Sequence, residues 1–123
     1  MNAQVINHVA STIREQIFWS ISKVEFWSWG CSKMLATTYQ NMPALALRVS
    51  GLQHKGWVVV ALDEARDCYK VFLQNVRYET KKVIEEVYCD NLGYILDMYI
   101  ERGTKSHEEY SKEALRDSAR KMA

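Results

Sequence analysis

The sequence has few cysteines, and their spacing excludes the sites that cysteines usually build. The three cysteines, Cys31, Cys68 and Cys89, are an odd number and include no Cys-x-x-Cys pair. A disulfide framework or a structural zinc site requires closer, paired ligands. We therefore expect reduced thiols that pack as small hydrophobic groups, in a protein of the cytoplasm.

Excess charge and long apolar runs are also missing. The chain carries 16 Lys and Arg against 15 Asp and Glu, a formal net charge of +1, so no global field draws it toward nucleic acid or an anionic membrane. No apolar run approaches the roughly 18 to 20 residues that span a bilayer. The N-terminus has neither the basic region nor the apolar core of a signal peptide. The sequence thus predicts a protein that is neither exported nor bound to membranes.

The residue patterns of catalysis are absent too, as is a glycine-rich phosphate loop. Cys31 and His54 are the residue types of a thiol nucleophile and its base, but they lie in separate segments with no third residue to orient the base. Asp63, Glu64 and Asp67 belong to a predicted turn, where aspartate commonly hydrogen-bonds nearby backbone. The sequence therefore predicts no enzyme, no metal site and no cofactor.

The centre of the chain, residues 44–76, predicts a three-stranded antiparallel meander. Three runs rich in β-branched and aromatic residues are separated by short polar breaks that contain glycine or aspartate. In the first run, Leu45, Leu47 and Val49 alternate with small or charged residues, which is typical of a sheet covered on one face. The second run, residues 57–62, is apolar on both faces and suits a central strand.

Helical periodicity flanks this predicted sheet on both sides. From about residue 3 to residue 24, apolar residues recur at steps of three and four and form one stripe. A second helix is expected from Tyr88 onward, and Gly93 inside it indicates a close packing contact. Two segments remain open. Residues 34–39 form either a fourth strand or an irregular crossover, and residues 77–87 either continue the sheet or begin a helix.

These elements predict one α+β domain over residues 1–103. Its core is a three- to four-stranded antiparallel sheet packed with an N-terminal helix and a C-terminal helix. Residues 104–123 are mostly polar and contain few large apolar side chains. We expect them to form a polar helical or partly disordered tail.

Aromatic residues gather after the first predicted helix, at Phe26, Trp27 and Trp29, and Gly30 follows as a helix stop. Such rings most often fill the space between a helix and a sheet, but when exposed they form a docking surface. Aromatic residues without catalytic groups favour a non-enzymatic protein-interaction module that self-associates as a homo-oligomer. Its contact surface would be this segment or an open sheet edge.

The alternative is a small nucleic-acid-binding protein. Arg48, His54, Lys55 and Trp57 would form a basic surface with stacking capacity on the sheet. His54 and Lys55 belong to the break at residues 50–56, which is expected to be an exposed tip. The number of basic groups is modest, and no recognition motif accompanies them.

Several short motifs, structural in character, lie within residues 13–100. They are Trp27-Ser28-Trp29-Gly30, Leu47-Arg48-Val49, Lys55-Gly56, Asp67 with Tyr69-Lys70-Val71-Phe72, and Val87-Tyr88-Cys89-Asp90-Asn91-Leu92. In these motifs the chain resembles a group of small uncharacterised proteins from phages and mobile elements of gut bacteria. The resemblance implies a helix, an antiparallel sheet and a second helix. It implies no activity and no functional residues, and the tail after Gly103 lies outside it.

Overall fold

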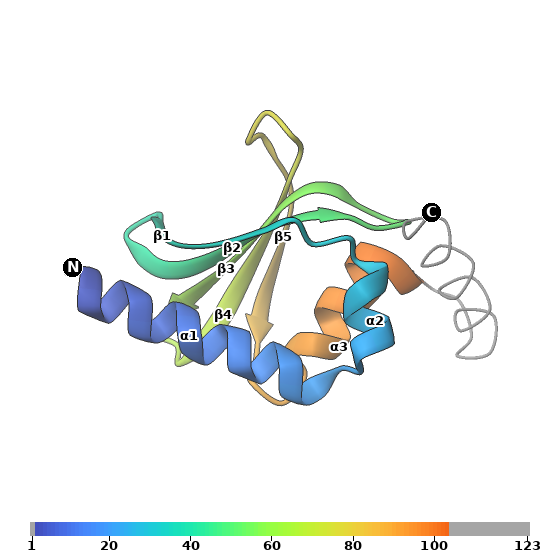
Figure 1. The fold of residues 1–123 in the computed structure, drawn as a ribbon. Helices are drawn as coiled ribbons and strands as arrows, with labels where there is room; N and C mark the ends of the chain where they lie inside the picture. The colour runs from blue at the N-terminus through green and yellow to red at the C-terminus, as the bar shows by residue number, and fades with distance from the viewer. Residues whose placement is uncertain (1, 104–123) are drawn as a thin grey trace.

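The computed structural model describes residues 2–103, and the predicted tail at residues 104–123 lies outside the described residues. The elements, in chain order, are α1 (Ala3–Ser20), α2 (Lys23–Ser28), β1 (Lys33–Tyr39), β2 (Met42–Ser50), β3 (Lys55–Asp63), β4 (Cys68–Gln74), β5 (Thr80–Val87), α3 (Leu92–Asp97) and the π-helical turn η1 (Met98–Arg102). Figure 1 shows α1 and α3 beneath a strongly twisted sheet. The predicted α+β class is confirmed.

The sheet is a five-stranded meander, one strand larger than the upper limit of the prediction. Its order is β1-β2-β3-β4-β5, and every neighbouring pair is antiparallel. Both segments that the sequence left open are strands: residues 34–39 lie within β1, and residues 80–87 form β5. Each is an edge strand, and edge strands expose more polar side chains than central ones. The alternation of apolar and polar residues that identifies a strand is therefore weak in both segments.

A two-residue turn joins β1 to β2. Gln40 and Asn41 both have positive φ, 51° and 63°, which is the backbone of a type I′ turn. The right-handed twist of such a turn matches that of the two strands, and it sets the pairing of Tyr39 with Met42. The register then continues without a shift to the other end of β1.

The N-terminal helical region is two helices where one was predicted. α1 ends at Ser20, and Ser22 begins α2 through a capping box with Glu25, in which each side chain accepts a hydrogen bond from the other's backbone amide. α2 ends where Gly30 takes a positive φ of 59°, as predicted. Within residues 2–103, no helix is long and apolar enough to cross a membrane.

The main core lies between the helices and one face of the sheet. It includes the three alternating residues predicted in β2. Gly93 packs directly against Ser20, which confirms the close contact expected there. The fully buried members of this core are Ile13, Ile17, Trp29, Leu47, Val49, Val58, Val60, Val71, Val87, Leu92, Leu96 and Ile100.

The opposite face of the sheet is partly buried as well, because the sheet curls. A second, smaller cluster consists of Ala44, Ala46, Trp57, Val59, Ala61 and Phe72. The ring of Tyr39 packs on Phe72 with centroids 4.5 Å apart, and its hydroxyl hydrogen-bonds Thr80 Oγ1 at 2.9 Å. That bond joins the first strand to the last across this face. The expectation of a sheet covered on one side only is therefore wrong at its centre.

Candidate interaction surfaces

The predicted aromatic surface is divided between the core and the exterior. Trp29 is fully buried, and its indole Nε1–H donates to the Asp97 carboxylate at 2.8 Å. Phe26 is half-buried against Trp29, with ring centroids 5.5 Å apart. Trp27, by contrast, keeps 59% of its surface exposed. Trp29 and Phe26 lie three residues apart on the inward face of α2, and Trp27 lies on the outward face, so Trp29 cannot contact a partner.

The loop between β2 and β3 is exposed at Leu52, Gln53 and Lys55, as expected, but its backbone is held against η1. The backbone amide of Leu52 donates to Glu101 Oε2 at 2.7 Å. The amides of Gln53 and His54 both donate to the Ile100 carbonyl, at 2.9 and 3.2 Å. A side chain and a backbone carbonyl of η1 therefore fix this loop, and nothing nearby in the sequence signals that contact.

Three residues from separate strands and a turn meet on the sheet face that lies opposite the helices. The guanidinium of Arg48 lies 5.8 Å from the centroid of the Trp57 ring, and Tyr78 stacks on the same ring at 5.7 Å with an interplanar angle of 23°. Lys33 is paired with Arg48 in the β1–β2 register, and Lys55 precedes Trp57 by two residues, so both share this face. We call Lys33, Arg48, Lys55, Trp57 and Tyr78 the basic aromatic face.

The basic aromatic face contains three of the four residues of the nucleic-acid alternative. The fourth, His54, turns its ring toward the backbone, and its Nε2 lies 3.1 Å from the Trp57 carbonyl. Sequence reasoning missed Lys33 and Tyr78. The pairing of β1 with β2 would have located Lys33, but Tyr78 reaches Trp57 through the fold of the β4–β5 turn, which begins beside Gln74, the strand partner of Trp57.

A hollow of about 290 Å³ opens on this face between β1 and the Trp57–Tyr78 pair. Its walls include the side chains of Lys33, Leu35 and Thr37 from β1. The indole Nε1 of Trp57 is buried and has no hydrogen-bond partner within residues 2–103. The hollow is mainly apolar, with a basic residue at its edge.

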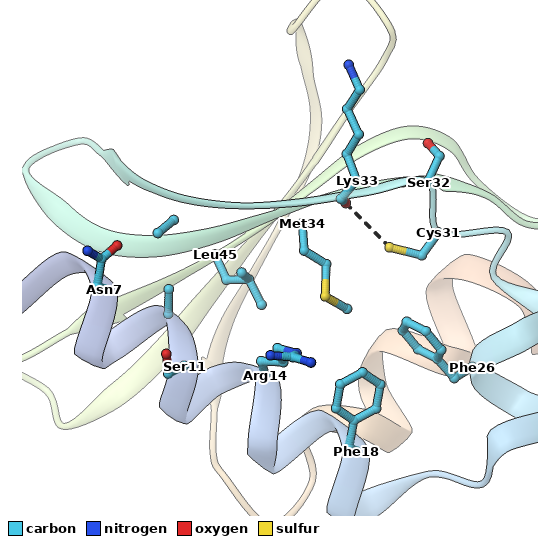
Figure 2. Close-up of a pocket in the computed structure, with 12 residues that line it drawn as sticks. Asn7, Ser11, Arg14, Phe18, Phe26, Cys31, Ser32, Lys33, Met34 and Leu45 are labelled. Carbon is cyan, nitrogen blue, oxygen red and sulfur yellow. Dashed lines mark hydrogen bonds between the residues drawn. The ribbon is translucent and has the colours of Figure 1, made fainter.

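A larger groove of about 590 Å³ lies on the other side of β1, between that strand and α1. In Figure 2, Met34 points from β1 toward Arg14 and Phe18 on α1, whereas Lys33 points away from the groove. The Arg14 guanidinium lies 5.5 Å from the Phe18 ring centroid, and Phe18 contacts Phe26 edge to face at 4.8 Å. Both faces of β1 therefore border open space.

The two edges of the sheet differ in how they are protected. β5 carries four charged residues, and its register with β4 shifts at two places. Charged side chains and bulges are the usual devices that keep an edge strand from pairing with another chain. β1 has an unbroken register with β2, and Lys33 at its first position is its only charged residue. The edge formed by β1 is thus the unprotected one.

The thiols and carboxylates considered from the sequence have ordinary structural contacts. The Cys31 thiol donates to the Lys33 carbonyl at 3.4 Å, and its burial raises the pKa of that thiol (Figure 2). Asp63 forms an ion pair with Lys70 at 3.7 Å and lies 4.0 Å from Arg66. In the described part of the chain, no three His, Cys, Asp or Glu side chains are grouped to hold a metal ion.

The three thiols are expected to react with iodoacetamide at different rates. Cys89 is exposed and should react first, whereas Cys68 is buried and should react only on unfolding. Cys31 should be intermediate, because burial both shields it and raises its pKa, which lowers the fraction of thiolate at any given pH. Peptide mass spectrometry over a time course checks the order. Equal rates for Cys31 and Cys68 in the native protein would contradict it, and urea should equalise all three.

No protein-family model, no curated protein and no solved structure has a significant match to this chain. The resemblance to small proteins of phages and mobile elements therefore stays a prediction.

Proposed function

We propose that this protein is a non-enzymatic interaction module that self-associates by pairing β1 of one copy with β1 of a second copy. The observation that supports the proposal is the contrast between the two sheet edges. Within residues 2–103 no strand pairs with the peptide groups on the outer side of β1, and neither a bulge nor a central charge hinders the approach of one. Pairing of two such edges would produce one continuous sheet.

The sequence of β1 is compatible with pairing to itself. In an antiparallel arrangement centred on Ala36, Lys33 lies opposite Tyr39 of the second copy, and Leu35 lies opposite Thr37. No like charges then face each other. The two Leu35 side chains become diagonal neighbours on one face, within contact range for large side chains. Leu35 is 48% exposed in the single chain, so the pairing removes an apolar side chain from water.

The open space beside β1 accommodates a second strand. Side chains of an added strand alternate between the two faces of the sheet. On the helix side they would enter the groove between β1 and α1, whose floor includes Leu45 and Met34. On the other side they would border the hollow beside Leu35. A free edge flanked by pockets on both faces is the arrangement by which proteins bind an added strand.

Leu35→Lys is expected to weaken self-association by about tenfold or more. The substitution removes the apolar contact across the two-fold axis and places two ammonium groups near each other. Val83→Lys on β5 is the matched control, because Val83 is 45% exposed and also lies on an edge strand. Light scattering coupled to size-exclusion chromatography, over a range of concentrations, measures the mass of each variant.

The wild-type chain and Val83→Lys should approach twice the monomer mass of 14.3 kDa as concentration rises, while Leu35→Lys remains near the monomer mass. A strictly monomeric wild-type protein at high concentration would remove the proposal. Equal weakening by both substitutions would show that β1 is not the contact.

A further inference from the structure

We propose that the basic aromatic face binds single-stranded nucleic acid, with a base stacked on Tyr78 and the phosphates contacted by Lys33, Arg48 and Lys55. The function proposed above concerns the edge of β1 and its pairing with a second copy. The present site lies on the sheet face around Trp57, and the binding of a nucleic acid there does not require a dimer.

The ring of Tyr78 is held ready for stacking. One of its faces lies on Trp57, while 68% of the residue remains exposed. The turn that carries Tyr78 is ordered by Asn75, whose side-chain oxygen accepts hydrogen bonds from the amides of Arg77 and Glu79 at 2.9 and 3.0 Å. This turn holds Tyr78 at a positive φ of 68° and projects away from α1 (Figure 1). A base would extend the existing stack of two rings at little entropic cost.

Positive charge is concentrated at this end of the face. Lys33, Arg48 and Lys55 form no ion pair with any carboxylate in residues 2–103. Elsewhere on the same side of the sheet, Lys70 lies within ion-pair distance of both Asp63 and Glu85, at 3.7 and 3.8 Å. Unpaired basic groups around an aromatic stack are the combination that binds the phosphates and bases of a single strand.

The turn beside this face carries one acidic residue, Glu79, and Lys81 at the start of β5 pairs with it. Glu79 lies 3.8 Å from Lys81, and it accepts a hydrogen bond from the Asn75 side chain at 3.3 Å. Its charge is thus largely balanced locally. Arg77 on the same turn is exposed and adds a further positive group near Tyr78. The site therefore has a net positive charge without help from the rest of the chain.

The exposed ring of Tyr78 favours a single strand over two other anionic ligands, a nucleic-acid duplex and an acidic peptide. In a duplex the faces of the bases are covered by their neighbours, so Tyr78 would gain no stacking contact except at an end. An acidic peptide would satisfy the basic groups but would leave the ring and the adjoining hollow of about 290 Å³ unused. Unpaired bases fit the ring, the hollow and the charges together.

The proposal is tested by fluorescence anisotropy with a labelled oligothymidylate of about 16 nucleotides at low salt. Tyr78→Ala is expected to weaken binding about 5- to 100-fold, the effect of one lost base stack. Tyr78→Phe, which retains the ring, should bind as the wild type does. Tyr88→Ala removes a comparably exposed tyrosine from the connection between β5 and α3, and it should have no effect.

The salt dependence tests the phosphate contacts separately. Lys33→Ala should reduce the slope of log affinity against log salt by about 0.7, whereas Lys23→Ala, at the start of α2, should leave it unchanged. Absence of binding at low salt would overturn the proposal. An equal reduction of the salt slope in Lys33→Ala and Lys23→Ala would also overturn it. So would an affinity for the oligonucleotide that Tyr78→Ala leaves unchanged. If polyglutamate displaced the oligonucleotide from wild type and Tyr78→Ala equally well, the face would be a site for acidic peptides instead.

Discussion

Replacing Trp29 by alanine is expected to lower the free energy of unfolding by about 3–5 kcal/mol, as for other buried tryptophans. The ring is fully buried in the main core, where it contacts Phe26, and its indole donates a hydrogen bond to the buried Asp97. Alanine would leave a cavity between α2, the sheet and α3. It would also remove a donor from a carboxylate that lies away from water.

Trp27→Ala is the control for this substitution, because the two tryptophans are two residues apart and differ mainly in burial. Trp27 is 59% exposed, so its loss should cost about 0.5 kcal/mol or less. Urea denaturation followed by circular dichroism measures both variants. If the two losses were similar, Trp29 would not be the core residue described above, and the division of the aromatic segment would have to be abandoned.

Gly51→Ala should have the second largest effect, a loss of about 3 kcal/mol. A Cβ at Gly51 would collide with the backbone carbonyl of Ile100 and would lie 2.9 Å from Glu101 Oε2. A backbone oxygen cannot rotate away as a side chain can. The loop would therefore have to move, and the amides of residues 52–54 would lose the acceptors that η1 provides.

Leu52→Ala provides the comparison for Gly51→Ala. Leu52 lies next to Gly51 in the same loop, but its side chain is exposed, so truncation should cost about 0.5 kcal/mol. Thermal unfolding of the two variants, under conditions in which wild type unfolds reversibly, gives the difference. A melting temperature of Gly51→Ala within about 2 °C of wild type would contradict the described packing of the loop on η1.

The central strands were predictable from sequence because burial on both faces leaves an unbroken apolar signal. The run at residues 57–62 lies within β3, and the alternation of Leu45, Leu47 and Val49 correctly separates the two faces of β2. The edge strands were not predictable. β1 and β5 owe their conformation to pairing with a neighbouring strand, and one or both of their faces meet solvent. Their apolar residues therefore do not follow the two-residue repeat of a strand clearly enough to exclude a helix or a loop.

The candidate site was predictable only in part. Arg48 and Trp57 are antiparallel partners across one hairpin, so a correct register places them together. Tyr78 joins them because the turn after Gln74, the β4 partner of Trp57, folds over this face; that conformation depends on the Asn75 hydrogen bonds and on a positive φ at a non-glycine residue, which the sequence does not signal. The distinction between Trp27 and Trp29 was likewise hidden, because helical spacing puts the two rings on opposite faces but the separate helix α2, and which of its faces packs inward, were not predicted.

The meander order of the sheet has a consequence for how the chain folds. Each strand pairs with the strand next to it in sequence, so the hairpins can form through short loop closures. The contact between α1 and α3, in contrast, joins the two ends of the described chain. During synthesis α1 is made before the sheet, yet one of its packing partners, α3, emerges only after all five strands. We therefore expect the strands to assemble in chain order, and α1 to complete its docking only after α3 has left the ribosome.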